Sequence, residues 1–239
     1  MIQLGSLDAL VLAGGLGTRL GPLATNRPKV MMPINGTPFL HYLLEYLHGF
    51  GIRRVVLALG HLAEAVTDYT SARSWNGLEI VTSVESAQLG TGGSLRFALP
   101  LLRSAGVLVL NGDSFVRADL NRFAAFHESK QALISLLLTY VPVADRYGSV
   151  TTDAHEQVTS FREKYAEGPA DGFVNAGVYL MARSVIEAMP EGQAISLEKE
   201  IFPAYCGRGL YGMKGRFPFI DIGTPESYRK ASLFFGGGR

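Results

Sequence analysis

Short apolar runs alternate with longer amphipathic segments in the first half of the chain, and this alternation constrains the fold more than any other feature. The runs that predict buried strands are rich in leucine or β-branched residues and end at a turn signal: Asp8–Ala13, Arg53–Gly60, Leu78–Val84 and Val107–Asn111. The segments between them that predict helices are Phe39–Phe50, Leu62–Ala72, Gly92–Arg103 and Leu120–Lys130. This β-α-β-α succession predicts an α/β fold with a Rossmann-like mixed, mainly parallel sheet and helices on both faces.

The second half of the chain reads differently, with more strands and fewer helices. The expected strands are Ile134–Val141, Gly148–Thr152, Gln157–Phe161 and Phe173–Met181, and the expected helices are Leu197–Tyr205 and Pro225–Phe235. Neither a linker-like change of composition nor an internal repeat separates the halves. We therefore expect one domain over residues 1–235, with halves of about 1–132 and 133–235, and a flexible tail at 236–239.

Composition narrows the classes of function. The 239 residues are 47% hydrophobic and 18% charged, which is typical of a compact globular protein. A net charge of +1 predicts neither a nucleic-acid-binding nor a membrane-binding surface. The single cysteine, Cys206, is expected to be a buried structural thiol. Because the N-terminus lacks the pattern of a signal peptide and no run is long enough to span a bilayer, we expect a cytoplasmic protein.

A glycine-rich, basic loop directly follows the first predicted strand. In Gly14–Arg19 (GGLGTR), glycines let backbone N–H groups approach a phosphate closely. Arg19, Arg27 and Lys29 follow, and no acidic residue occurs between Asp8 and Glu45, so the segment is suited to a triphosphate. It is not a Walker A loop, and Leu20 stands where a dinucleotide fingerprint needs its third glycine. Glycines alone also permit the simpler interpretation of a tight structural turn.

Two aspartates each follow an apolar run and precede a turn or helix. Asp113 closes the run that begins at Val107, and Asp221 lies in the segment FIDIGTP. A carboxylate at the end of a buried strand should lie at the edge of the sheet where the glycine-rich loop opens. Two such carboxylates beside a triphosphate would form a hard oxygen site suited to Mg²⁺. Taken singly, either aspartate could instead cap the structure that follows it.

Residues Leu12–Leu40 resemble the signature of the sugar-1-phosphate nucleotidyltransferases, LAGGxGTRLxPLTxxxPKxxxPxxxxPxL, with Ala24 before Thr25 as a small departure. Further motifs extend the resemblance over essentially the whole chain. It implies a GT-A-like nucleotidyltransferase fold and the transfer of a nucleoside monophosphate from a nucleoside triphosphate to a sugar 1-phosphate, with release of pyrophosphate. The usual Asp-x-Asp of GT-A glycosyltransferases is absent, because Ser114 and Phe115 follow Asp113.

The resemblance also implies roles for individual residues. Those expected to bind the nucleotide are Leu12, Ala13, Gly14, Gly15, Gly17, Thr18, Arg19, Lys29, Glu85, Gly90, Thr91 and Asp113. Those expected to bind the sugar phosphate are Gly112, Gly148, Glu163, Lys164, Asn175 and Gly177. Arg19 and Lys29 would steady the phosphates, Asp113 and Asp221 would hold Mg²⁺, and Lys164 would orient the attacking phosphate, which makes these five the expected catalytic residues.

Several of these assignments have structural alternatives. Thr91 could be only an N-cap, and Glu163–Lys164 only a surface ion pair. Gln88 stands where family members often have proline, so a contact between its side chain and the base is less expected. Glu198 could either face the sugar or serve as the third residue of a helix-capping box.

The choice of substrates rests on finer similarity. Residues Pro33–Leu40, with the segments LGTGG and NGDSF, most resemble D-glycero-D-manno-heptose 1-phosphate guanylyltransferases. This implies GTP and D-glycero-α-D-manno-heptose 1-phosphate as substrates and a nucleotide-sugar for surface polysaccharide or glycan synthesis as product. Alternatives are a mannose 1-phosphate guanylyltransferase, a uridylyl or thymidylyl transferase for another hexose 1-phosphate, and a regulatory subunit that only binds nucleotide-sugars. A homo-oligomer is compatible with any of these.

Overall fold

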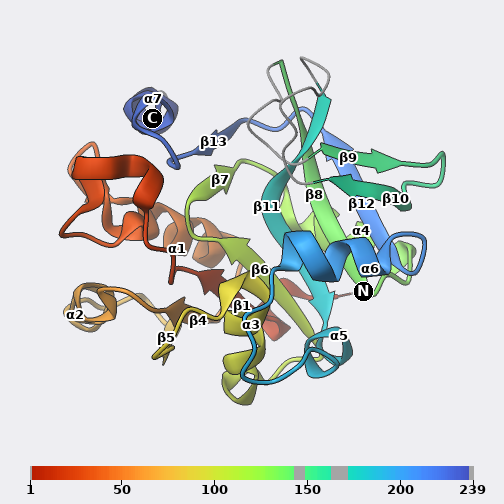
Figure 1. The fold of residues 1–239 in the computed structure, drawn as a ribbon, viewed down its shortest axis with the longest axis horizontal. Helices are drawn as coiled ribbons and strands as arrows, with labels where there is room; N and C mark the ends of the chain where they lie inside the picture. The colour runs from red at the N-terminus through yellow and green to blue at the C-terminus, as the bar shows by residue number, and fades with distance from the viewer. Residues whose placement is uncertain (1, 143–148, 163–171, 237–239) are drawn as a thin grey trace.

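The computed structural model describes residues 2–142, 149–162 and 172–236, and within them a nine-stranded sheet forms the centre of the fold (Figure 1). Its strand order is β10-β9-β11-β6-β1-β4-β5, and β8 pairs with β11 and with β12. The strands of this sheet are β1 (Asp8–Leu12), β4 (Arg54–Leu59), β5 (Glu79–Val84), β6 (Gly106–Asn111), β8 (Ile134–Val141), β9 (Ser149–Thr152), β10 (Val158–Arg162), β11 (Gly172–Ala182) and β12 (Leu210–Gly215).

The predicted mainly parallel arrangement of the first half is confirmed. Strand β1 pairs in parallel with β4 and β6, and β4 pairs in parallel with β5. Strand β11 runs antiparallel to both β6 and β8, which makes the sheet mixed. Because β1 and β6 are parallel and Leu12 pairs with Asn111, the segments that follow these strands leave the sheet at the same edge.

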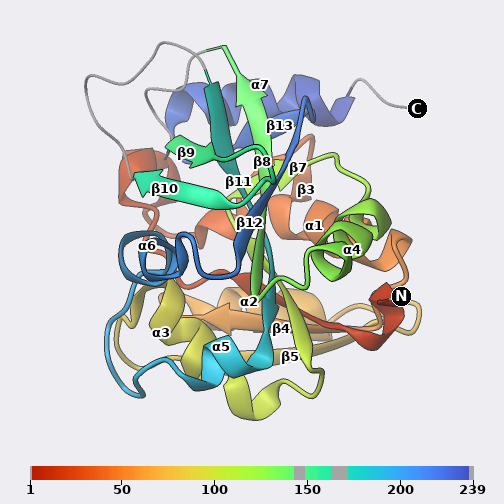
Figure 2. The same ribbon diagram turned by 90° about the vertical axis from the view of Figure 1, so that its right-hand side faces the viewer.

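Helices cover both faces of the sheet, as predicted (Figure 2). Alternate residues of β1 enter different cores: Ala9 and Val11 pack into one, and Leu10 packs into the other. The helices that contribute to the first core are α1 (Phe39–Gly49), α2 (Ala63–Ser71), α4 (Leu120–Ser129) and α7 (Pro225–Gly236). Those that contribute to the second are α3 (Gly90–Phe97), α5 (Arg183–Glu187) and α6 (Phe202–Tyr205).

Two predicted helices have different boundaries, and proline explains both. The helix expected over Gly92–Arg103 ends at Phe97 and is followed by a 3-10 turn at Leu99–Leu101 that contains Pro100. The helix expected over Leu197–Tyr205 begins as a π-helical turn, Leu197–Ile201, before α6. Pro203 lacks the N–H that a regular α-helix would need at that point. Helix α5 and strand β12 were not predicted; β12 contains Gly212 and Gly215, which weaken a strand pattern.

A small antiparallel pair brings a distant part of the chain to the edge of the main sheet. Strand β7 (Ser114–Val116) pairs with β13 (Phe219–Asp221), with Asp221 opposite Ser114. The N–H of Ile222 donates to the carbonyl oxygen of Asp113 at 2.8 Å. Consequently Asp113, which directly precedes β7, lies next to the end of β13 that carries Asp221, the other aspartate expected to hold a metal.

The remaining short elements are the strands β2 (Pro33–Ile34) and β3 (Thr37–Pro38) and the 3-10 turns Leu4–Ser6, Thr18–Ala24 and Lys29–Met31. None of the helices in the described parts of the chain has the length and apolar character needed to cross a membrane.

Candidate active site

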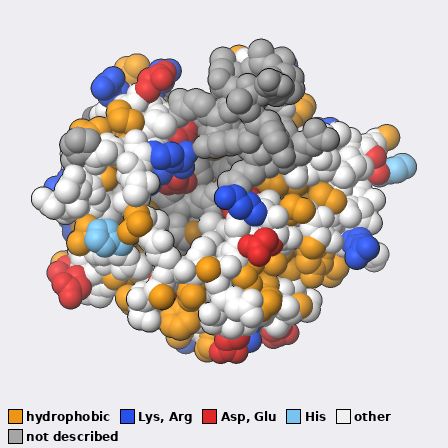
Figure 3. Space-filling model, in the orientation of Figure 1, with side chains coloured by type: hydrophobic (Ala, Val, Ile, Leu, Met, Phe, Trp, Pro, Cys, Tyr) orange, Lys and Arg blue, Asp and Glu red, His pale blue; other side chains and the backbone are white. Residues whose placement is uncertain are grey.

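A cavity of about 460 Å³ opens where β1 and β6 end. Figure 3 shows this face hollowed near its centre, with lysine or arginine side chains on the rim. Gly112 lines the cavity, and so does every residue that the sequence predicted to bind the nucleotide. The latter are Leu12, Ala13, Gly14, Gly15, Gly17, Thr18, Arg19, Lys29, Glu85, Gly90, Thr91 and Asp113. The fold therefore brings four separate segments of the chain into one pocket of a size suited to a nucleotide.

Gly112 permits the close approach of the two strand ends. Its N–H donates to the carbonyl oxygen of Leu12 at 2.9 Å. A Cβ atom at this position would lie 2.6 Å from that oxygen and 2.8 Å from Cγ1 of Val30, so a larger residue would displace the segment. Glycine is therefore required to hold the following residue, Asp113, beside the glycine-rich loop.

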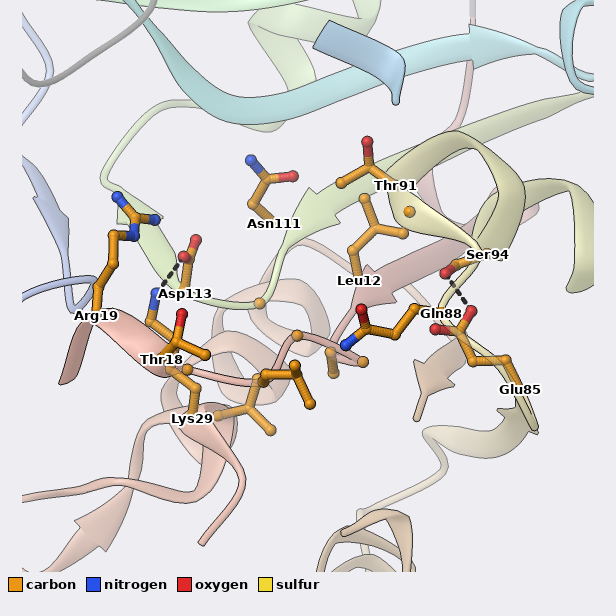
Figure 4. Close-up of a pocket in the computed structure, with 18 residues that line it drawn as sticks. Leu12, Thr18, Arg19, Lys29, Glu85, Gln88, Thr91, Ser94, Asn111 and Asp113 are labelled. Atoms are coloured by element: carbon orange, nitrogen blue, oxygen red, sulfur yellow. Dashed lines mark hydrogen bonds and ion pairs between the residues drawn. The ribbon is translucent and has the colours of Figure 1, made fainter. Parts of the chain in front are cut away.

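The basic end of the cavity contains an ion pair. Nζ of Lys29 lies 2.5 Å from Oδ2 of Asp113, with the lysine side chain only 10% exposed and the aspartate side chain 33% exposed (Figure 4). Burial opposes ionisation of Asp113, but the charge and hydrogen bond of Lys29, together with the charge of Arg19, outweigh it and leave the pKa of Asp113 below its ordinary value. Asp113 is therefore an anion held between two cations.

Asp221 lies at the same end. Its Oδ1 accepts hydrogen bonds from the N–H of Gly223 at 2.8 Å and from Oγ of Ser227 at 3.3 Å. A Cβ atom on Gly223 would lie 2.8 Å from that oxygen, 3.4 Å from Nζ of Lys29 and 3.6 Å from Nη2 of Arg19. Asp221 thus stabilises the start of α7, as the capping alternative expected, and also lies close to the two basic side chains.

Asp113 and Asp221 are the carboxylates available for a metal at this end. The described residues contain no group of three or more histidine, cysteine, aspartate or glutamate side chains suited to a metal. Two carboxylates beside a phosphate site nevertheless fit Mg²⁺, which takes one or two protein carboxylates and completes its shell with phosphate and water oxygens. Nζ of Lys29 already donates to Oδ2 of Asp113, so a metal ion on that oxygen would compete with Lys29 for the same negative charge.

The opposite end of the cavity contains the carboxylate of Glu85. Oε2 of Glu85 accepts a hydrogen bond from Oγ of Ser94 at 2.5 Å. Gly90 adopts φ +69°, and a Cβ atom there would lie 2.6 Å from the carbonyl oxygen of Ile195. The N–H of Gly92 donates to that same oxygen at 2.8 Å, which holds the first turn of α3 against Ile195.

Thr91 is not an N-cap, so that alternative is wrong. Its Oγ1 donates to Oε2 of Glu198 at 2.7 Å and accepts from the N–H of Leu197 at 2.8 Å. The capping alternative for Glu198 is wrong as well, because Glu200 accepts from the N–H of Ser196 at 2.7 Å instead. Glu198 is therefore turned toward the interior.

Of the residues predicted to bind the sugar phosphate, the structure describes only Gly112, Asn175 and Gly177. The N–H of Gly177 donates to Oδ1 of Asn175 at 2.9 Å, and Nδ2 of Asn175 donates to the hydroxyl of Tyr179 at 2.8 Å. Gly177 adopts φ +74°, and a Cβ atom there would lie 3.0 Å from Cβ of Asn111, so β11 closely approaches the end of β6. The other predicted residues, Gly148, Glu163 and Lys164, lie outside the described residues.

Several residues of the site were not predicted. Asn111, Ser94 and Val30 line the cavity. Gln88 lines it as well, although the sequence made a contact between its side chain and the base less expected. A polar residue at the end of an apolar strand was a usable signal for Asn111, whereas the partner of Ser94 depends on tertiary contacts. The expectation of a buried thiol at Cys206 was wrong: the residue is half-buried, and its Sγ donates to the carbonyl oxygen of Phe202 at 3.5 Å.

Comparison with known proteins identifies the family. Residues 8–236 match the family described as nucleotidyl transferase, and the chain belongs to it. This confirms the resemblance read from the sequence, and the fold agrees with it. Proteins of this family generally use a divalent metal ion.

Three similar proteins have more specific names. A mannose-1-phosphate guanylyltransferase of Mycobacterium tuberculosis is 38% identical over 95% of the chain, which spans 64% of that relative's length. A D-glycero-alpha-D-manno-heptose 1-phosphate guanylyltransferase of Aneurinibacillus thermoaerophilus is 34% identical over 94% of the chain and 96% of its own length. The crystal structure of HddC from Yersinia pseudotuberculosis complexed with GMP-PN has a TM-score of 0.85 and 32% identity, and the alignment covers 96% of this chain and 99% of that one.

Proposed function

We propose that the protein transfers a GMP group from GTP to D-glycero-α-D-manno-heptose 1-phosphate, forming a nucleotide-sugar and pyrophosphate. The observation that carries the proposal is one cavity in which the glycine-rich loop, Arg19 and Lys29 lie beside the carboxylate of Asp113, with Asp221 next to the same basic end. The relatives named above supply the substrate class, and the Aneurinibacillus thermoaerophilus relative, matched over 96% of its own length, is named for the heptose phosphate.

The chemistry requires positioning and charge neutralisation rather than a protein nucleophile. An oxygen of the sugar phosphate attacks the α-phosphorus of GTP, and the bond to the leaving pyrophosphate breaks. Arg19 and Lys29 bind the phosphates on which negative charge increases, so Lys29 would exchange Asp113 for a phosphate oxygen. We assign the orientation of the attacking phosphate to Lys164 and contacts with the sugar to Gly148, Glu163, Asn175 and Gly177.

Asp113 and Asp221 would hold Mg²⁺, which supplies neutralisation of phosphate charge when it is bound. The pKa of Asp113 lies below its ordinary value because Lys29 and Arg19 outweigh the effect of burial. This carboxylate is consequently in the ionised form that a metal ligand needs. The β7–β13 pair and the hydrogen bond from the N–H of Ile222 to the carbonyl oxygen of Asp113 hold the two aspartates near each other.

Glu85 supports guanine as the base. The Watson–Crick edge of guanine presents two adjacent donors, N1–H and the N2 amino group, whereas uracil and thymine present one donor between two carbonyl oxygens. A carboxylate only accepts hydrogen bonds and therefore complements guanine. Ser94 holds Oε2 of Glu85 in place at 2.5 Å and thereby orients the group at the end of the cavity remote from Lys29.

A matrix of GTP, UTP, dTTP and CTP against heptose, mannose and glucose 1-phosphates, with Mg²⁺ and pyrophosphate release as readout, tests the proposal. We expect the largest kcat/KM with GTP and the heptose phosphate. Mannose 1-phosphate is the second candidate acceptor, because the mycobacterial relative is named for it. Binding of nucleotide-sugars without pyrophosphate release in any combination would instead establish the regulatory alternative and overturn the proposal.

Glu85→Gln provides a test of base choice. Glutamine retains one acceptor but replaces the other with a donor, so preference for GTP over UTP should fall by about tenfold or more. Glu79→Gln is a matched control, since Glu79 lies at the opposite end of β5 from Glu85 and contacts Arg54 and Arg103. An unchanged preference in Glu85→Gln would exclude Glu85 from base recognition.

A further inference from the structure

A buried hydrogen-bond network joins the wall of the nucleotide cavity to strand β11. At its centre is the hydroxyl of Tyr179, a residue with no exposed surface. This hydroxyl contacts Oε1 of Glu198 at 3.3 Å, Nδ2 of Asn175 at 2.8 Å and Nδ2 of Asn111 at 3.2 Å. Glu198 also accepts from Thr91, so the network begins and ends at residues that line the cavity.

The direction of each hydrogen bond follows from the number of protons. A phenol has one proton to donate, and a carboxylate can only accept, so Tyr179 donates to Glu198. The oxygen of Tyr179 must then accept from both asparagine amides. Burial raises the pKa of Tyr179 well above its ordinary value, which keeps that proton in place.

Both amides are therefore fixed with nitrogen toward Tyr179 and oxygen away from it. Oδ1 of Asn175 accepts from the N–H of Gly177. Oδ1 of Asn111 is buried and has no hydrogen-bond partner within the described part of the chain. Figure 4 shows the Asn111 side chain at the middle of the cavity wall, between the Arg19–Asp113 end and Thr91. A buried acceptor without a hydrogen-bond partner is uncommon, and it indicates that a bound ligand supplies the donor.

We propose that Oδ1 of Asn111 accepts a hydrogen bond from a hydroxyl group of a bound substrate, and that Glu198 is a positioning residue that orients Asn111 through Tyr179. The inference rests on the proposed function, which places a ribose and a sugar in contact with this wall. The hydroxyl belongs to the ribose of the nucleotide or to the acceptor sugar, because Asn111 lines the nucleotide cavity and also lies beside Gly177 of the sugar-side strand, where a Cβ atom would be 3.0 Å from Cβ of Asn111.

The test measures how strongly the enzyme discriminates against substrates that lack one hydroxyl. One arm compares GTP with 2′-deoxy-GTP and 3′-deoxy-GTP, and the other compares the acceptor sugar phosphate with its monodeoxy analogues. In the wild-type enzyme, one analogue should lose about tenfold in kcat/KM. Loss in the nucleotide arm assigns the hydroxyl to the ribose, and loss in the acceptor arm assigns it to the sugar.

Variants then connect that discrimination to Asn111 and Glu198. Asn111→Leu, which has a similar volume and no acceptor, should turn over the parent substrate about tenfold more slowly and no longer discriminate against the critical analogue. Asn111→Asp retains an acceptor and the side-chain size, and should retain the discrimination. Glu198→Gln can donate to Tyr179, which releases the orientation of Asn111, and should lose the discrimination. Glu200→Gln is its control, because Glu200 caps the same helix without entering the network.

Each outcome has a definite meaning. Wild-type discrimination in a folded Asn111→Leu enzyme, or equal turnover of every deoxy analogue by the wild type, would overturn the proposal. Discrimination lost in Asn111→Leu but kept in Glu198→Gln would overturn the role of Glu198. If the wild type releases no pyrophosphate with any substrate pair, the proposed function fails, and calorimetric binding of GTP against its two deoxy forms still tests the ribose assignment.

Discussion

Replacement of Asp113 by asparagine is the sharpest perturbation of the site. The side chain keeps its size, but Lys29 loses the anion that lies 2.5 Å away, and one of two carboxylates for a metal is removed. A hydrogen bond to a charged group contributes about 1.5–3 kcal/mol to stability, and the lower end applies because Asp113 is 33% exposed. Turnover should fall far more, by about a hundredfold or greater, because charge stabilisation at the reacting phosphate is lost.

Pyrophosphate release over a range of Mg²⁺ concentrations measures the loss of turnover, and urea unfolding measures the loss of stability. Asp119→Asn is the matched control: Asp119 caps α4 by accepting from the N–H groups of Asn121 and Arg122, and asparagine caps a helix equally well. Undiminished turnover in Asp113→Asn would remove Asp113 from the reacting centre. An equal loss in Asp119→Asn would show that the effect is not specific to the site.

Two further changes test the cavity wall and the core. Gly90→Ala should raise the KM for nucleotide and destabilise the fold by more than Gly192→Ala, which incurs only the roughly 1–2 kcal/mol of left-handed backbone strain. The reason is that a Cβ atom at position 90 meets the carbonyl of Ile195, whereas one at position 192 meets nothing within 4 Å. Equal losses of stability in the two variants would contradict this steric argument. Burial lowers the pKa of His127 to about 4, below its ordinary value of 6.5. As the pH falls, the imidazole is therefore protonated in the unfolded chain before it is protonated in the folded one. The free energy of unfolding should decrease by on the order of 3 kcal/mol as the pH falls from 6.5 to 4. His127→Gln should lack this part of the pH dependence. The same change of unfolding free energy with pH in the variant and the wild type would refute the role of His127.

Local patterns were sufficient to predict the strands that form the base of the site. Strand β1, the loop Gly14–Arg19 and the position of Asp113 follow from apolar runs, glycines and a charge at a strand end, which depend on neighbouring residues only. Helix ends were less predictable where proline intervenes. The early end of α3 before Pro100 and the π-helical turn before α6 depend on which backbone N–H groups find partners.

The amino-acid sequence by itself determined the chemical class of the protein, because a phosphate-binding loop between a strand and a basic segment is a local arrangement. Tertiary structure decided which side chains meet. Lys29 and Asp113 are 84 residues apart and meet only because β1 and β6 are parallel neighbours in register. Asp221 reaches them through the β7–β13 pair, and Glu198 reaches Asn111 only through Tyr179. Contacts of this kind depend on sheet order and register, which no local pattern in the chain specifies.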